Sequence, residues 1–126
     1  MKTKFSSSWI KSKQSRKQRK YRRYAPLHIK QKFVGAHLSK DLRKKYNRRS
    51  INLRKGDGVK VMRGQFKNKT GKIEEANLKK SLVYVAGIEI VKRDGTKARY
   101  PIHPSNIMIT GLNMDDKRRS KIFERK

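Results

Sequence analysis

Two groups of basic side chains are the residues best suited to chemistry in this chain, and that chemistry is phosphate binding. The first group lies in the turn-rich interval 63–70, which carries Arg63, Lys67 and Lys69 and no acid. The second is the run 11–24, KSKQSRKQRKYRRY, where arginine is mixed with lysine. Guanidinium groups pair with phosphate oxygens through two parallel hydrogen bonds, and ammonium groups attract them as point charges. Both groups therefore predict binding to a polyanion.

Aromatic residues are interleaved with the second basic group, which favours RNA or DNA as the polyanion. Phe5, Trp9, Tyr21 and Tyr24 lie within the first 24 residues. Arginine and aromatic side chains both stack on nucleic-acid bases. Because this arm offers almost nothing to bury and its charges repel one another, we expect it to be disordered until it meets its target. The alternative interpretation is a solvated basic tail or a localisation signal.

The sequence contains no set of residues typical of a catalytic or metal site. There is no cysteine, and His28, His37 and His103 lack a spaced network of Asp or Glu. Glu74 and Glu75 are adjacent in an expected strand, so their side chains point to opposite faces and cannot act as an acid–base pair. The glycines are not followed by the Gly-Lys-Ser/Thr of a nucleotide-binding loop. We therefore predict no enzyme activity, no metal and no cofactor.

Composition limits the fold and the partner further. The 126 residues include 37 Lys and Arg against 9 Asp and Glu, a net charge of +28, and only 33% are hydrophobic. A chain this charged cannot bury a large core, and its self-repulsion calls for a partner of opposite sign. That partner could be nucleic acid, an anionic membrane or an acidic protein. No apolar run is long enough to span a membrane, and no secretory signal opens the sequence. The absence of cysteine suits a reducing compartment.

Most of the charge excess lies before residue 51, so we expect the folded core to follow it. Residues 1–50 hold 18 basic residues and one acid. Helices are expected from Pro26 to about Val34 and from Ser39, as N-cap, to Tyr46. The four predicted segments are a basic arm at 1–26, a helical linker at 27–50, a barrel at 51–111 and a C-terminal helix at 112–126. The residues expected to dock the linker on the core are Leu27, Ile29, Phe33, Leu38 and Leu42.

Short strands with glycine-rich corners dominate the middle of the chain. Val59 and Val61 alternate with polar or exposed positions, the period of a strand with one buried face. Asp94-Gly95 is a strong hairpin signal, and Gly87 predicts a sharp bend. The expected strands are 58–63, 71–77, 81–86, 88–93, 96–101 and 106–109. They predict a mainly β protein built on a small barrel. Its expected core is Val59, Val61, Ile73, Val83, Val85, Ile88, Ile90, Ile107 and Ile109.

The C-terminal segment is expected to be a short helix whose order depends on a partner. Asn113 or Asp115 is predicted to cap it, with Asp115 and Asp116 in the first turn. Arg125 and Lys126 at its end would also suit the helix dipole.

The run 58–73, GVKVMRGQFKNKTGKI, resembles the KOW motif, a strand–loop–strand unit carried on an SH3-like barrel. Gly71 matches the glycine of the motif. Asn68 departs from it, since many members have a second glycine there, but asparagine tolerates a left-handed backbone. With the flanks 38–47, 85–88 and 101–106, the chain resembles the family of large-subunit ribosomal proteins universally numbered twenty-four. The archaeal and eukaryotic form of that family is numbered twenty-six.

The resemblance implies a structural role in the cytoplasmic ribosome. Members of the family bind large-subunit ribosomal RNA directly near its 5′ end, act early in assembly and lie close to the exit of the nascent-chain tunnel. The implied partners are that RNA and neighbouring ribosomal proteins, with no homo-oligomer. The alternatives are a KOW-domain factor of transcription elongation and a basic nucleoid protein. The residues predicted to contact RNA are Arg16, Arg19, Lys20, Tyr21, Arg22, Arg23, Tyr24, His28, Arg48, Arg49, Arg63, Gln65, Lys67, Lys69, Gly71, Lys72, His103, Ser105 and Asn106.

Overall fold

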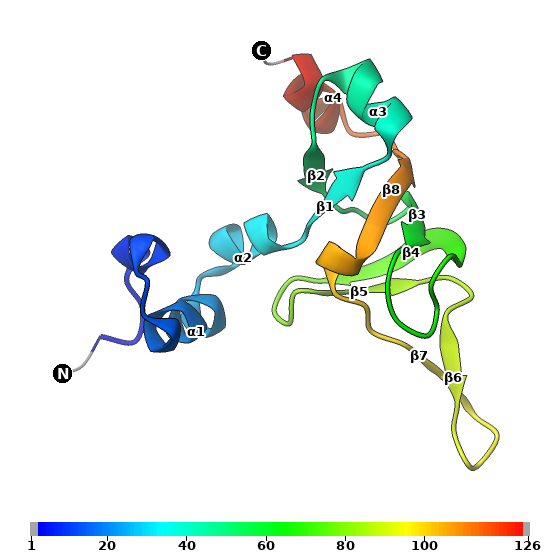
Figure 1. Ribbon diagram of the computed structural model, residues 1–126, viewed down its shortest axis with the longest axis horizontal. Helices are drawn as coiled ribbons and strands as arrows, with labels where there is room; N and C mark the ends of the chain where they lie inside the picture. The colour runs from blue at the N-terminus through cyan, green and yellow to red at the C-terminus, as the bar shows by residue number, and fades with distance from the viewer. Residues whose placement is uncertain (1–2, 125–126) are drawn as a thin grey trace.

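The protein, seen in a computed structural model that describes residues 3–124, is a mixed α/β molecule (Figure 1). A six-stranded sheet forms its centre, a two-stranded hairpin projects from it, and helices flank it at both chain ends. The prediction of a mainly β protein is wrong in this respect, because the helices hold about as many residues as the strands. The extra helical residues come chiefly from the N-terminal arm.

The central sheet has the strand order β2-β1-β8-β3-β4-β5. Strands β1 and β8 run parallel, and every other neighbouring pair of the sheet is antiparallel. The remaining strands, β6 and β7, pair only with each other and form the hairpin. The strand bounds are β1 Gly35–Leu38, β2 Ser50–Asn52, β3 Gly58–Val61, β4 Thr70–Asn77, β5 Leu82–Val85, β6 Glu89–Val91, β7 Lys97–Arg99 and β8 Ile107–Gly111.

All six predicted strands are present within a few residues of their expected bounds, but β1 and β2 were not predicted. Both are very short, and they lie within or at the end of the segment where the sequence indicated a helical linker. Their pairing depends on a long-range contact, because β1 is held by β8, some seventy positions further along the chain. The alternation of apolar and polar positions predicts a strand only over a longer run than these three or four residues.

The core follows the expected alternation in the sheet. Eight of its nine predicted members are buried, and Leu53 packs with them. Ile90 is 41% exposed, which corrects the prediction that it is buried. The reason is that β6 belongs to the projecting hairpin, whose faces are not covered by the sheet. The members of the buried core cluster that the sequence reading did not assign to the core are Val34, Ala36, Ile51 and Ile102.

The predicted bounds of the two linker helices are confirmed within one residue. Helix α2 spans Leu27–Phe33 and α3 spans Lys40–Tyr46. Ser39 caps α3 by accepting a hydrogen bond from the Leu42 N–H, and Asn47 ends it in a left-handed conformation. Leu27 is 52% exposed, however, so it does not dock the linker on the core.

The N-terminal arm is folded, which corrects the prediction of disorder. A 3₁₀ helix η1 at Ser7–Lys11 packs against helix α1 at Ser15–Tyr24. Tyr21 is only 6% exposed, stacking on Phe5 with ring centroids 5.4 Å apart and meeting the edge of Phe33 at 5.9 Å. The expectation that the arm could bury nothing missed this aromatic cluster. Figure 1 shows η1, α1 and α2 extending away from the sheet.

Helix α4, at Lys117–Glu124, lies beside α3 at the other end of the molecule (Figure 1). Asp116 precedes it and accepts a hydrogen bond from the Arg118 N–H at 2.7 Å. The cap is therefore Asp116 and not Asn113 or Asp115, and both aspartates lie before the first turn. The predicted favourable effect of Arg125 and Lys126 concerns residues outside the described range.

Candidate nucleic-acid interface

The loop between β3 and β4 holds its shape through backbone contacts. The Val61 N–H donates to the Lys69 carbonyl at 2.9 Å, and the Asn68 N–H donates to the Val61 carbonyl at 2.8 Å. Asn68 has a φ of +69°, the left-handed conformation that asparagine tolerates. The predicted equivalence of Asn68 to a glycine at this turn is confirmed.

An aromatic contact fixes the loop to the body of the protein. The Phe66 ring lies 5.0 Å from the Tyr100 ring and is partly buried against the core. Lys69 Nζ lies 5.1 Å from the centroid of the same ring. The side chains of Arg63, Gln65 and Lys67 are exposed. The loop thus presents its polar groups to solvent from an anchored backbone.

The second predicted contact, residues 103–106, lies directly beside this loop. The Met62 N–H donates to the Asn106 carbonyl at 2.8 Å, because β3 pairs with β8. The Ser105 N–H donates to His103 Nδ1 at 3.3 Å, and the Ser105 hydroxyl lies 2.8 Å from the same nitrogen. With Nδ1 accepting, Nε2 carries the ring proton and remains a donor. Residues 63–69 and 103–106 form one surface, called here the loop edge.

Gly71 has a structural reason to be glycine. A Cβ at this position would lie 2.6 Å from the Ala86 carbonyl oxygen and 2.8 Å from a methyl group of Val85. Contacts this short would force β4 and β5 apart. Gly71 therefore permits the close approach of two strands, while its neighbour Lys72 is exposed on β4. The structure gives a packing role to Gly71, which the sequence reading placed among the RNA contacts.

The arm presents most of its predicted contacts to solvent, with one exception. Tyr21 is buried, so its ring is not available to stack on a base while α1 stays packed. Arg23 lies over the Tyr24 ring at 5.6 Å, an arrangement that stiffens both side chains on the surface. The exposed predicted contacts of this region are Arg16, Arg19, Arg22, Arg23, Tyr24 and His28, and Lys20 is half-buried.

A basic cluster forms where His37 of β1 meets Arg43 and Arg49, and only Arg49 of the three was in the predicted set. Pairing of β1 with β2 places His37 opposite Ser50 and brings Arg49 close to it. Arg43 extends back from α3 and donates through Nε to the Leu38 carbonyl at 2.8 Å. Partial burial lowers the pKa of His37, and the charges of Arg43 and Arg49 lower it further. His37 escaped sequence reasoning because the β1–β2 pairing was not predicted. Arg48 and Arg49, which were predicted, are half-buried and exposed respectively.

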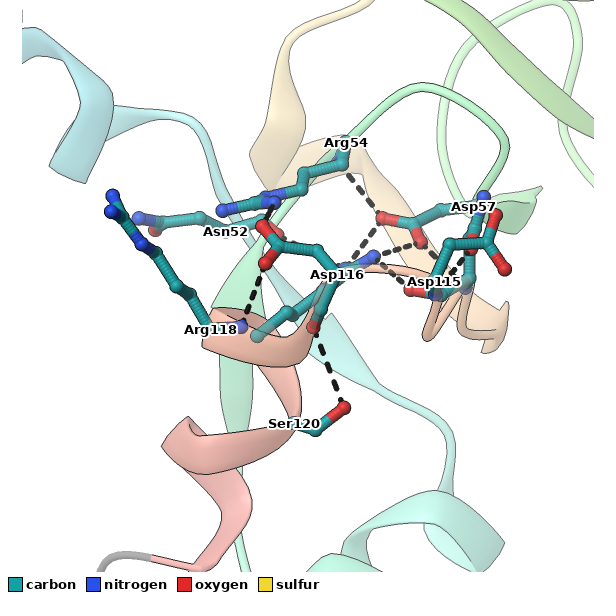
Figure 2. Close-up of polar contacts among 9 residues, drawn as sticks. Asn52, Arg54, Asp57, Asp115, Asp116, Arg118 and Ser120 are labelled. Atoms are coloured by element: carbon teal, nitrogen blue, oxygen red, sulfur yellow. Dashed lines mark hydrogen bonds and ion pairs between the residues drawn. The ribbon is translucent and has the colours of Figure 1, made fainter.

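The residues that sequence reasoning missed entirely are Asp57 and Arg119, which form a buried ion pair. Arg119 Nη1 and Nη2 donate to the two Asp57 carboxylate oxygens at 2.6 and 2.7 Å, with side chains 1% and 0% exposed. Asp57 also accepts from the backbone N–H groups of Arg54 and Asn113 (Figure 2). The pair joins the turn before β3 to helix α4. The two residues are 62 positions apart, and no local pattern in the sequence links them.

A second ion pair lies beside the first. Arg54 Nη1 contacts the Asp116 carboxylate, and this hydrogen bond holds the pKa of Asp116 below its ordinary value (Figure 2). Between residues 3 and 124, no three His, Cys, Asp or Glu side chains gather as metal ligands. Over the same range, no helix combines the length and the apolar character that a membrane crossing requires.

A six-stranded sheet with a basic loop edge and an exposed arginine-rich helix is the arrangement predicted for a nucleic-acid-binding protein of the KOW type. The matching family model covers residues 12–126 and describes the ribosomal proteins L26 of eukaryotes and their archaeal L24 counterparts. The chain belongs to this family, which is one of ribosomal proteins and not of enzymes.

Two archaeal relatives support the same assignment. The large ribosomal subunit protein uL24 of Methanothrix thermoacetophila is 52% identical over 114 residues, covering 90% of this chain and 98% of that protein. The protein of the same name from Methanosphaera stadtmanae is 47% identical over 115 residues, covering 91% and 98%. The similarity therefore extends over the sheet and both flanking regions.

Proposed function

We propose that this protein is a structural constituent of the large ribosomal subunit that binds large-subunit ribosomal RNA directly. It binds near the 5′ end of that RNA, early in assembly, and lies close to the exit of the polypeptide tunnel. Neighbouring ribosomal proteins are its other partners. The observation that carries the proposal is the loop edge, where two segments predicted separately to contact RNA lie side by side.

The loop edge suits the sugar–phosphate backbone better than the base edges. Its cations stand on a backbone fixed by hydrogen bonds, so little order has to be gained on binding. Helical RNA has a major groove too narrow for side chains, and proteins recognise it by shape, phosphates and 2′-hydroxyls. The loop edge therefore sets where the protein docks, and the arginines of α1 add affinity by neutralising phosphates.

Charge reversal tests this role with a control of the same kind. Lys67→Glu with Lys69→Glu places two negative charges on the loop edge. Lys79→Glu with Lys80→Glu makes the same change at the far end of β4. We expect the first variant to bind a transcript of the 5′ region of archaeal large-subunit RNA at least tenfold more weakly than the second. Equal losses would show that only net charge matters.

Crosslinking of the full chain to the same RNA, followed by mapping of the linked peptides, tests the location. Peptides from 63–69 and 103–106 are the expected products. Sedimentation of cell extract in high magnesium separates this proposal from a role in transcription elongation. Co-migration with the large subunit is expected, and a pool that is free or bound to RNA polymerase would contradict it.

A further inference from the structure

A cavity lies at the β2 edge of the sheet, between α2, β2 and α4. Its volume is about 230 Å³, and its lining includes Arg48, Arg54 and Arg119 but no acid. The other polar lining residues are Gln31, Ser50 and Asn52. This volume is several times the roughly 30 Å³ that one water occupies. It is smaller than the ~300–1,000 Å³ of a site for a drug-sized ligand. The space fits a small polar group.

Arg119 supplies a buried donor that has no acceptor. Its Nη1 and Nη2 groups bond to Asp57, and Nη2 also donates to the Asn52 carbonyl at 3.3 Å. Within residues 3–124, its Nε–H has no hydrogen-bond partner, although the side chain is only 1% exposed. Nε–H lies on the same edge of the guanidinium as the outer Nη2–H. That edge faces Asn52, which lines the cavity with Arg119.

The electrostatics of the cavity favour an anion over a neutral group. Arg119 is paired with the carboxylate of Asp57, and Arg54 with that of Asp116. Arg48, which has an interaction of its own within the chain, lines the cavity with a third guanidinium, and the whole chain carries +28. In Figure 2 the side chains of Asn52 and Arg54, which both line the cavity, extend in the same direction. A tetrahedral oxyanion could accept from several of these donors at once, as arginine forks do with phosphate.

We propose that the cavity between α2, β2 and α4 is a phosphate-binding site in which the Arg119 Nε–H and the neighbouring arginine and amide groups hold the oxyanion. The phosphate comes either from the RNA backbone or from free phosphate. The proposal that RNA supplies the phosphate rests on the proposed function. The proposal that the cavity binds phosphate does not. The simpler explanation of the orphan donor is a single bound water, which would not respond to phosphate.

Nuclear magnetic resonance of the full chain labelled with ¹⁵N reports on the site directly, because a buried arginine Nε–H gives its own signal. Inorganic phosphate is added in one titration and sodium chloride at equal ionic strength in another. We expect a saturable shift of the Arg119 Nε–H signal, together with the Ser50 and Asn52 amides, in phosphate only. An identical response to both salts would overturn direct phosphate binding.

Gln31→Glu tests the site without touching the ion pair of Arg119. The new carboxylate would compete with phosphate for the same guanidinium groups, so we expect phosphate affinity to fall at least tenfold. Val91→Glu, at an exposed position of the projecting hairpin, changes net charge equally and should shift the affinity less than twofold. The Arg119 Nε–H signal of both variants shows whether the fold is kept.

RNA-binding measurements separate the two phosphate sources. With RNA as the source, Gln31→Glu should lower the slope of log affinity against log salt by about one relative to Val91→Glu. A response to inorganic phosphate with unchanged RNA binding would identify a free-phosphate site. If wild-type protein does not bind RNA at all, the proposed function is wrong, but the titration with inorganic phosphate still shows whether the cavity binds phosphate. If RNA binds normally and neither probe responds, the cavity proposal alone is wrong.

Discussion

The two ends of this chain carry basic helices of similar composition that are held in opposite ways. Helix α4 buries one of its arginines, Arg119, against the carboxylate of Asp57 inside the molecule. Helix α1 keeps its arginines on the surface and buries Tyr21 instead. Helix α4 is attached by the buried ion pair and by a ring contact of Phe123 with Tyr46 at 4.3 Å, whereas α1 is attached by an aromatic cluster and no ion pair among residues 3–124.

The difference shows how a chain of +28 divides its cations between structure and binding. A buried guanidinium is tolerated only with a paired anion and further hydrogen bonds. Nine acids cannot provide that for 37 basic side chains. Asp57, deep in the fold, fixes α4. The arginines of α1 have no such buried partner among residues 3–124, so they remain available to phosphate.

Breaking the buried pair should have the largest effect. Arg119→Met leaves Asp57 buried without its counter-ion, and we expect unfolding to become easier by about 3–5 kcal/mol. Arg118→Met removes an exposed arginine from the same helix and should change the free energy of unfolding by no more than about 0.5 kcal/mol. Urea denaturation followed by circular dichroism measures both. Equal stabilities of the two variants would mean that α4 is not part of the cooperative fold.

Removing the arm should have the next largest effect. We expect it to lower the affinity for RNA and to leave the stability of the sheet unchanged. Deletion of residues 1–24 takes away the arginines of α1 but no member of the main core cluster. We expect RNA affinity to fall about 100-fold, near 2.7 kcal/mol. The slope of log affinity against log salt should flatten by about 0.7–0.9 for each phosphate that the shortened protein no longer neutralises. Filter binding at several salt concentrations measures this, and an unchanged slope would show that the arm does not touch phosphate.

Loosening the arm while leaving it attached should have a smaller effect. Tyr21→Ser removes two ring contacts, each worth about 0.5–1.5 kcal/mol beyond the buried area. The amides of α1 should therefore exchange with solvent about tenfold faster, with the sheet unaffected. Tyr24→Ser changes the same residue type where the ring is 44% exposed and should leave exchange nearly unchanged. Hydrogen exchange read by mass spectrometry compares the two.

The structural features that were predicted correctly from the sequence are those that depend on local patterns. The strands of the KOW unit, the Asp94-Gly95 hairpin, the Ser39 cap and the left-handed Asn68 all follow from alternation or turn chemistry within a few residues. The burial of Val59 and Ile107 follows from the same alternation.

The features that the sequence did not reveal depend on contacts between distant residues. Strands β1 and β2 exist because β8 supplies an edge for β1. Asp57 is read locally as a turn residue, and only the fold brings Arg119 to it. Tyr21 is read as a base-stacking residue until Phe5 and Phe33 enclose it. The exposure of the predicted contacts in the loop edge supports their placement, but contact with RNA stays a prediction.

The smallest expected effect is a pH dependence of stability and of RNA affinity that comes from His37 in strand β1. Burial, Arg43 and Arg49 lower the pKa of His37 from 6.5, so the ring is neutral at pH 7. Without RNA, the His37 ring binds a proton more readily in the unfolded chain than in the folded protein as the pH is lowered. The free energy of unfolding therefore decreases as pH falls below about 6.5. A nearby RNA phosphate reverses this preference, because it favours the charged ring.

Binding at His37 would then take up a proton, so RNA affinity should rise about two- to threefold between pH 7.5 and pH 6, within the tenfold that one unit of pKa allows. In a protein that already carries His28→Gln and His103→Gln, the two other histidines and both predicted RNA contacts, His37→Gln should remove this rise. Affinity measured across this range at constant ionic strength decides the point. A rise that survives all three substitutions would mean that His37, beside Arg43 of α3 and Arg49 before β2, does not meet RNA phosphate. The arm and the loop edge alone would then carry the binding.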